Sequence, residues 1–288
     1  MKLIFLSGSR SSSTEFVHSL LDGHPQVLAV PFPMMFHYFW RLHGEVAQQG
    51  ASALFEALRN KSGLAMVLSN YNDPGNPYMY KDDRTAEKLN IDMALFRNGF
   101  IKYLDGSMIS RRNAFLAFYR SYSEAIGHPW DEVDVILENS HNTFYHRDIL
   151  EDFSDACFIS PIRDPHAIFA SCRKGRFGYV YEGLAETSIL MHLYQTFINQ
   201  LIYSRLLGPE RYYLIKNETI HQNKRACMEE LAKWCEIEFN EILMQSTFAN
   251  SHWEGNSAYK KGSDKGVLRA ATGEQPRWMS ELSTSEIR

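Results

Sequence analysis

The amino-terminal residues constrain the fold of this chain more than any other stretch. Leu3 to Leu6 form a continuous apolar run, which is typical of a strand buried on both faces of a parallel sheet. Residues 7–13 are small and polar except for one arginine, and apolar residues then recur at helical spacing from Phe16 to Leu21. A strand that passes through such a loop into a helix predicts an α/β protein, in which ligands bind beyond the carboxyl ends of the strands.

Strand-like and helix-like segments alternate along the rest of the sequence. Apolar runs predict further strands at 27–30, 133–137, 156–162 and 212–215. Helical spacing predicts helices at 93–103, 113–126, 145–153, 165–173, 186–207 and 224–235. We therefore expect one domain, residues 1–288, with a mostly parallel central sheet flanked by helices. Residues 31–130 are helical and rich in aromatic side chains, with a turn-forming cluster at 72–77, and are expected to form an insertion or lid.

Composition restricts the kinds of partner. The formal net charge of −4 and a charged fraction of 22% argue against a protein that coats nucleic acid, so a bound anion must be held by a local site. The four cysteines show neither a CxxC pair nor metal-ligand spacing, which fits a reducing compartment. The sequence contains no apolar stretch long enough for a signal peptide or a membrane span, so we expect a cytoplasmic protein.

The loop Gly8-Ser9-Arg10-Ser11-Ser12-Ser13-Thr14 is suited to holding an anion. A helix amino terminus presents unpaired N–H groups, and small side chains let an anion approach the backbone. Arg10 adds a cation to this loop, and the serine and threonine hydroxyls add donors. The pattern GxxxxGK[ST] is missing, which argues against Mg-ATP. The alternative is a helix capping box formed by Ser12 and Glu15.

A second segment, 158–171, runs from a predicted strand into a predicted helix. Arg163 stands at the strand end, and Ser171 follows about two helical turns later. Taken alone, Arg163 and Asp164 could equally form a surface turn.

Together the two segments resemble the sulfotransferases that use 3′-phosphoadenosine 5′-phosphosulfate (PAPS). Their 5′-phosphosulfate loop, [KR]-S-G-T-T, is matched by Arg10 to Thr14, with Ser12 at the glycine position. Their 3′-phosphate motif, a strand followed by R-D-P-x(5)-S, is matched by Arg163 and Ser171. The resemblance implies a P-loop nucleotide-binding-like fold, with residues 31–130 as a lid over the acceptor site.

The resemblance also implies roles for individual residues. The enzyme would move a sulfuryl group from PAPS to a hydroxyl or amine, leave 3′-phosphoadenosine 5′-phosphate (PAP), and require no metal. Arg10 would stabilise charge on the departing phosphate, and the residues that follow it would bind the 5′-phosphate: Ser11, Ser12, Ser13 and Thr14. Arg163 and Ser171 would bind the 3′-phosphate. Lys260 and Lys261, or alternatively Lys265, would close over that phosphate unless they belong to a solvated tail.

The general base is assigned less directly. Cytosolic relatives carry K-T-H after a strand, and the matching stretch here is Asn139-Ser140-His141, which makes His141 the first candidate. His37 and Glu138 are the alternatives. The sequence departs from the family at Asn139, where relatives have lysine, and at Glu15, where many have an aromatic residue.

The acceptor and two competing functions stay open. The aromatic run from Phe32 to Trp40 could line a pocket for an apolar or aromatic small molecule or a carbohydrate, or could belong to the core. The chain could also be an inactive PAP-binding protein, or a P-loop phosphotransferase that uses ATP. No feature of the sequence indicates an oligomeric state.

Overall fold

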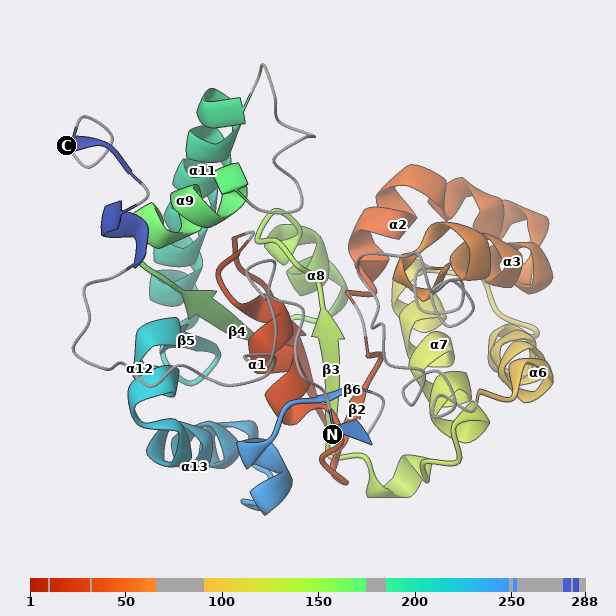
Figure 1. The fold of residues 1–288 in the computed structure, drawn as a ribbon. Coiled ribbons are helices and arrows are strands. Elements are labelled where there is room, and N and C mark those ends of the chain that lie inside the picture. The colour runs from red at the N-terminus through yellow and green to blue at the C-terminus, as the bar shows by residue number, and fades with distance from the viewer. Residues whose placement is uncertain are drawn as a thin grey trace.

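The computed structural model describes residues 1–9, 11–31, 33–65, 91–174, 185–248, 251–252, 277–280 and 282–284. Its centre is a five-stranded sheet with the order β2-β3-β1-β4-β5, in which every neighbouring pair is parallel (Figure 1). The strands are β1 (Lys2–Leu6), β2 (Val27–Ala29), β3 (Val135–Asn139), β4 (Cys157–Ile162) and β5 (Tyr212–Lys216). The expected α/β class is confirmed.

Helices cover both faces of this sheet (Figure 1). They are α1 (Thr14–Leu21), α2 (Phe36–His43), α3 (Ala51–Lys61), α6 (Met93–Leu104), α7 (Arg111–Ala125), α8 (His146–Asp152), α9 (Pro165–Lys174), α11 (Ala185–Leu207), α12 (Asn217–Gln222) and α13 (Lys224–Cys235). Short 3₁₀ turns lie at Gly44–Gln49, Trp130–Glu132, Glu241–Met244 and Arg277–Ser280. A small antiparallel pair is formed by β6 (Thr247–Phe248) and β7 (Ser251–His252). No helix among the described residues is long and apolar enough to cross a membrane.

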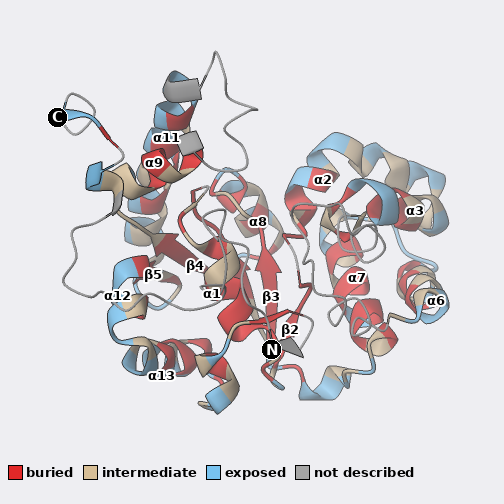
Figure 2. Cartoon of the chain, viewed as in Figure 1, coloured by how far each residue is buried: buried red, intermediate tan, exposed pale blue. Residues whose placement is uncertain are grey.

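The side chains of β1 alternate between two hydrophobic clusters, as a doubly covered strand requires. Ile4 and Leu6 pack with residues of α1 and α13 on one face. Phe5 packs on the other face with aromatic residues that include Phe36 and Phe115. Figure 2 shows the result, with the sheet and the inner sides of the helices buried. β1 is therefore a central strand, and the loop that follows it opens at the middle of the sheet.

Strand β3 begins and ends two residues later than the apolar pattern indicates. Lys2 pairs with Val135 and Leu6 pairs with Asn139, so the polar residues Glu138 and Asn139 complete the strand. Both side chains are buried and hydrogen-bonded, which hydrophobic periodicity does not register. Ser140 and His141 consequently lie directly at the carboxyl edge of the sheet.

The aromatic run before α3 belongs mainly to the core. Met34, Phe36 and Phe39 are fully buried and pack with α3, α6 and α7. Tyr38 is exposed, and Phe32 and the turn cluster at 72–77 lie outside the described residues. Of the two interpretations of this run, core packing holds for the buried members.

Candidate functional site at the carboxyl edge of the sheet

The loop between β1 and α1 folds back tightly on itself. A Cβ atom on Gly8 would lie 2.5 Å from Oγ of Ser12 and 3.3 Å from the carbonyl oxygen of Pro161. Ser12 donates from its backbone N–H (3.1 Å) and its hydroxyl (2.6 Å) to the carbonyl of Ser9. Glycine at position 8 is therefore required by close approach, and the backbone of the loop is drawn against β4.

Two serines of this loop adopt left-handed backbone conformations, with φ 58° at Ser11 and 83° at Ser13. Ser12, at the family's glycine position, is not one of them, so a side chain fits there without this strain. Ser13 is the N-cap residue of α1, but its side chain makes no capping hydrogen bond to the helix. The capping box expected as an alternative is not formed, and no Ser13 side-chain cap competes with a ligand for the first N–H groups of α1.

The structure brings the two sequence motifs together. The guanidinium of Arg163, at the end of β4, donates from Nη1 to the carbonyl of Ser11 at 2.9 Å. Cys172 on α9 lies against the same serine, with its Sγ 3.7 Å from Oγ of Ser11. Ser171, its neighbour on α9, is half-buried. Residues 152 positions apart along the chain thus meet at the carboxyl edge of the sheet.

The end of β5 contributes to the same edge, which the sequence analysis did not assign to the site. Ser13 donates from Oγ to Oδ1 of Asn217 at 2.8 Å. The carboxylate of Glu218 accepts a hydrogen bond from the backbone N–H of Asp164 at 3.1 Å. Both residues follow the end of β5, and polar residues at a strand end are the feature of the sequence that could have indicated their place in the site.

His141 projects from the turn after β3, next to the first turn of α1. Its backbone has φ 61°, and its N–H donates to Oδ1 of Asn139 at 3.0 Å. Its ring Nδ1 lies 3.4 Å from Oε1 of Glu15, and the two side chains are 25% and 31% exposed. Asn139, at the family's lysine position, therefore shapes the turn that carries His141.

The other two candidate bases are buried. Glu138 is 1% exposed and accepts hydrogen bonds from the Phe36 N–H at 2.9 Å and from the hydroxyl of Ser140. Burial raises the pKa of its carboxyl. His37 is equally buried, with Nε2 3.2 Å from Oδ2 of Asp152. These contacts connect β3 and α8 to α2.

A buried polar network holds the start of the loop between β1 and α1. Nε2 of His146 lies 2.7 Å from Oγ of Ser7, the first residue after β1. Ser160 donates to the carbonyl of Ser7 at 2.7 Å, and Gln200 on α11 donates to Oγ of Ser160 at 2.9 Å. Burial lowers the pKa of His146 to about 3, so its ring is neutral. The network fixes where β1 ends and the loop begins.

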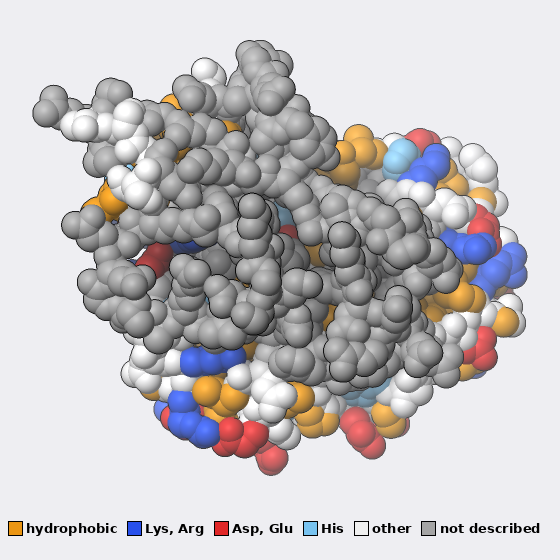
Figure 3. Space-filling view, viewed as in Figure 1, with side chains coloured by type: hydrophobic (Ala, Val, Ile, Leu, Met, Phe, Trp, Pro, Cys, Tyr) orange, Lys and Arg blue, Asp and Glu red, His pale blue; other side chains and the backbone are white. Residues whose placement is uncertain are grey.

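Charge is not concentrated over the surface that can be seen. Basic and acidic side chains lie side by side where the described surface is visible (Figure 3). Among the described residues, no group of three or more histidine, cysteine, aspartate or glutamate side chains could hold a metal ion. Arg10, Lys260 and Lys261 lie outside the described residues.

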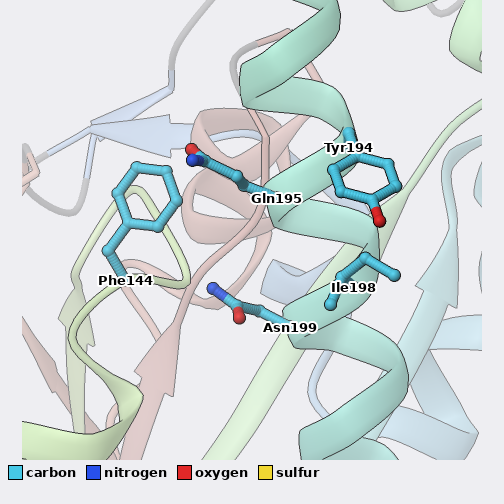
Figure 4. Close-up of a pocket in the computed structure, with 5 residues that line it drawn as sticks. All are labelled: Phe144, Tyr194, Gln195, Ile198 and Asn199. Atoms are coloured by element: carbon cyan, nitrogen blue, oxygen red, sulfur yellow. The ribbon is translucent and has the colours of Figure 1, made fainter.

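A pocket of about 430 Å³ lies between the turn after β3 and α11. It is lined by Phe144, Tyr194, Gln195, Ile198 and Asn199. The amides of Gln195 and Asn199 point from α11 toward Phe144, while Tyr194 and Ile198 project from the adjacent side of the helix (Figure 4). Asn199 also donates to Oγ1 of Thr143 at 3.2 Å, which connects the helix to the turn. None of the predicted site residues lines this pocket.

The fold and the position of the site define a parallel α/β protein whose candidate ligand site lies beyond the carboxyl ends of its central strands. The family model for the sulfotransferase family matches residues 4–241. The chain therefore belongs to the sulfotransferase family.

Solved structures agree in fold. The sulfotransferase domain of the Synechococcus PCC 7002 olefin synthase superposes with a TM-score of 0.56 at 16% identity, over 100% of this chain and 90% of that one. The sulfotransferase domain from the curacin biosynthetic pathway gives 0.54 at 15% identity, over 92% and 82%. No curated protein sequence matches the chain significantly.

Proposed function

We propose that this sulfotransferase moves a sulfuryl group from PAPS to a hydroxyl or amine of an acceptor. The observation that carries the proposal is the hydrogen bond from Arg163 to the carbonyl of Ser11, because it joins the two segments expected to hold the two phosphates of one nucleotide. Arg163 and Ser171 would bind the 3′-phosphate, and the backbone from Ser11 to Thr14 would bind the 5′-phosphate.

The local structure supports an anion at the loop. The N-cap side chain leaves the first N–H groups of α1 uncapped, and Gly8 lets the loop backbone pack closely against β4. Arg10 would add a cation on the leaving oxygen, and Lys260 and Lys261 would close over the nucleotide. PAPS supplies an activated sulfuryl group whose leaving group is already a phosphate anion, so this proposal needs no metal.

His141 is the proposed general base. Its ring is reachable from solvent at the sheet edge, whereas Glu138 and His37 are almost fully buried. With Nδ1 facing Glu15, Nε2 is left to take the acceptor proton. The acceptor oxygen or nitrogen then bonds to sulfur as the bond from sulfur to the phosphate oxygen breaks, and PAP leaves with the electron pair. Glu15 would orient the ring and stabilise its positive charge.

The proposal also covers the domain organisation and the class of acceptor. Residues 1–288 would form one domain, with residues 31–130 as its lid and a small molecule or carbohydrate as acceptor. The buried aromatic side chains of α2 and α7 support a packing role behind the acceptor pocket rather than direct contact with the acceptor. The four cysteines are free thiols, which supports a cytoplasmic location.

Calorimetric titration with PAP, AMP and ATP, with and without Mg²⁺, tests the donor assignment. We expect metal-independent binding with a clear preference for PAP. Arg163→Ala should weaken PAP binding at least about tenfold more than AMP binding, because only PAP carries the 3′-phosphate, whereas loss of the hydrogen bond to Ser11 affects both nucleotides. The matched control is Arg147→Ala on α8, whose side chain is 81% exposed.

Two results would overturn the proposal. Preference for Mg-ATP would indicate a phosphotransferase, and equal losses of PAP and AMP binding in Arg163→Ala would remove the 3′-phosphate role. PAP binding without turnover on any acceptor would instead identify a nucleotide-binding protein that does not catalyse transfer.

A further inference from the structure

Helix α11 carries an apolar face that is exposed in the part of the chain that the structure describes. Its members, hereafter the α11 apolar face, have exposed fractions between 36% and 65%: Leu190, Met191, Tyr194, Ile198, Leu201 and Ile202. The opposite side of the helix is buried against the molecule through residues such as Leu193, Thr196 and Gln200. The helix therefore turns apolar side chains toward solvent while its buried side includes the polar Thr196 and Gln200, which reverses part of the usual pattern of a surface helix.

The size of this face is at the upper end of what a monomer normally exposes. The sequence has no Asp, Glu, Lys or Arg from Thr187 to Ser204. Six side chains that are about half exposed present on the order of 600 Å² per copy, near the lower bound of stable protein interfaces, about 1,200 Å² for both partners. Phe144, 42% exposed, extends the face, since it shares a pocket with Tyr194 and Ile198 (Figure 4).

The six residues of the face form a pattern that is symmetric about position 196; Leu206, a further exposed apolar residue of α11 (68%), has Glu186 at its mirror position and lies outside this pattern. Reversing the helix about this position exchanges Leu190 with Ile202, Met191 with Leu201, and Tyr194 with Ile198. Thr196 itself is fully buried, so the centre of symmetry on the exposed side lies directly opposite it. A second copy laid antiparallel on this helix would meet an apolar side chain at each of these six positions.

We propose that the α11 apolar face binds a second copy of this chain across a two-fold axis. Closed two-fold pairing is the commonest symmetry of soluble oligomers and requires a self-complementary surface, which the exchange about position 196 provides. Residues 191, 194, 198 and 201 also have the alternating three- and four-residue spacing of helices packed at a small angle. This inference does not depend on the proposed function.

The pairing has a consequence for the pocket beside the face. Tyr194 and Ile198 line that pocket and lie closest to the two-fold axis. A second copy seated there covers the α11 side of the pocket. Access to it then depends on assembly.

Analytical ultracentrifugation of the full chain tests the proposal. We expect a dimer in the wild type, and monomers in Tyr194→Glu and Ile198→Lys, with the dimer dissociation constant raised at least about tenfold. The matched control is Met108→Lys, which replaces an 88% exposed apolar residue between α6 and α7 and should leave the dimer intact.

Mixing the two monomeric variants tests the antiparallel register. In a mixed dimer, the carboxylate introduced by Tyr194→Glu on one copy would face the ammonium group introduced by Ile198→Lys on the other. The mixture should therefore form a dimer that neither variant forms alone. Circular dichroism checks that both variants are folded.

A second pair of variants covers the case in which either charged variant does not fold. Tyr194→Cys mixed with Ile198→Cys should give a disulfide between copies under oxidation, because the antiparallel register brings these two positions together. A wild type that is monomeric at every concentration, or a mixture that does not pair or cross-link, overturns the proposal.

Discussion

His141 and Glu15 meet at the centre of the site although they are 126 positions apart along the chain. A carboxylate beside a phosphate site weakens anion binding by like-charge repulsion if it stands alone. Here its Oε1 lies 3.4 Å from the imidazole Nδ1, so its charge acts first on the histidine. Under the proposed function, Glu15, a departure from the family pattern, would therefore orient the ring of His141.

Substitutions of these two residues should have different effects. His141→Ala should lower kcat by about 10²–10⁴-fold and leave PAP affinity unchanged, because it removes the proton acceptor. Glu15→Gln should lower kcat on the order of tenfold, because it removes only the charge beside the ring. Steady-state kinetics together with PAP titration separate the two effects.

Glu45→Gln, an exposed acid on the 3₁₀ turn after α2, is the matched control. Normal turnover in His141→Ala would move the base to another residue. A Glu15→Gln variant that loses nucleotide affinity instead of kcat would make Glu15 part of the binding loop.

The loop between β1 and α1 acts as one element because its contacts are mutual. Gly8 and Ser12 are in close approach, and Ser12 in turn holds Ser9. Ser11 and Ser13 store backbone strain that the rest of the structure must offset, since serine disfavours positive φ. Hydrogen bonds from Arg163 to Ser11 and from Ser13 to Asn217 stabilise this conformation at both places.

Gly8→Ala should destabilise the chain by about 1–3 kcal/mol and weaken PAP binding, because the added methyl group displaces Ser12. In a Ser12→Ala background the same change should cost less, since the atom 2.5 Å away is gone. A double-mutant cycle of urea unfolding measures this coupling. Strict additivity would show that Thr14 or Pro161, rather than Ser12, sets the limit at this position.

The strands could be predicted from the sequence because they are apolar runs, whereas the site could not, because it depends on polar contacts between distant residues. The apolar runs of β1, β4 and β5 predicted strands that the structure confirms. The last residues of β3 were missed because Glu138 is buried through hydrogen bonds, which no periodicity reveals. Asn217 and His146 were missed for a similar reason, because their importance comes from side chains that meet them only in the folded chain.

The whole molecule carries a pH dependence through its buried histidines. Burial lowers the pKa of His146 from 6.5 to about 3 and that of His18 from 6.5 to about 4. Below pH 6.5 the unfolded chain takes up protons that the folded chain does not, so the free energy of unfolding falls as pH falls, by about 1 kcal/mol per pH unit for each histidine. Glu138 acts in the opposite sense, because its raised pKa lets the folded chain hold a proton more tightly.

Urea unfolding between about pH 7 and pH 5 measures this slope. His146→Asn removes one of the rings whose pKa burial lowers and should make the dependence on pH shallower, at some loss of stability from the altered contact with Ser7. Unfolding free energies that do not change over this range would contradict the assignment of neutral buried rings.

The strand order determines when each strand can meet its partners as the chain is synthesised. β1 emerges first, but its two neighbours in the sheet are β3 and β4, and Lys2 pairs with Val135. At roughly 5–20 residues per second, on the order of ten seconds separate the synthesis of β1 from that of its partner β3. Before β3 is made, β1 has no strand partner in the sheet, and the edge formed by the Arg163–Ser11 and Ser13–Asn217 hydrogen bonds requires β4 and β5 as well. β5, at one edge of the described five-stranded sheet, thus completes the candidate site that begins after β1.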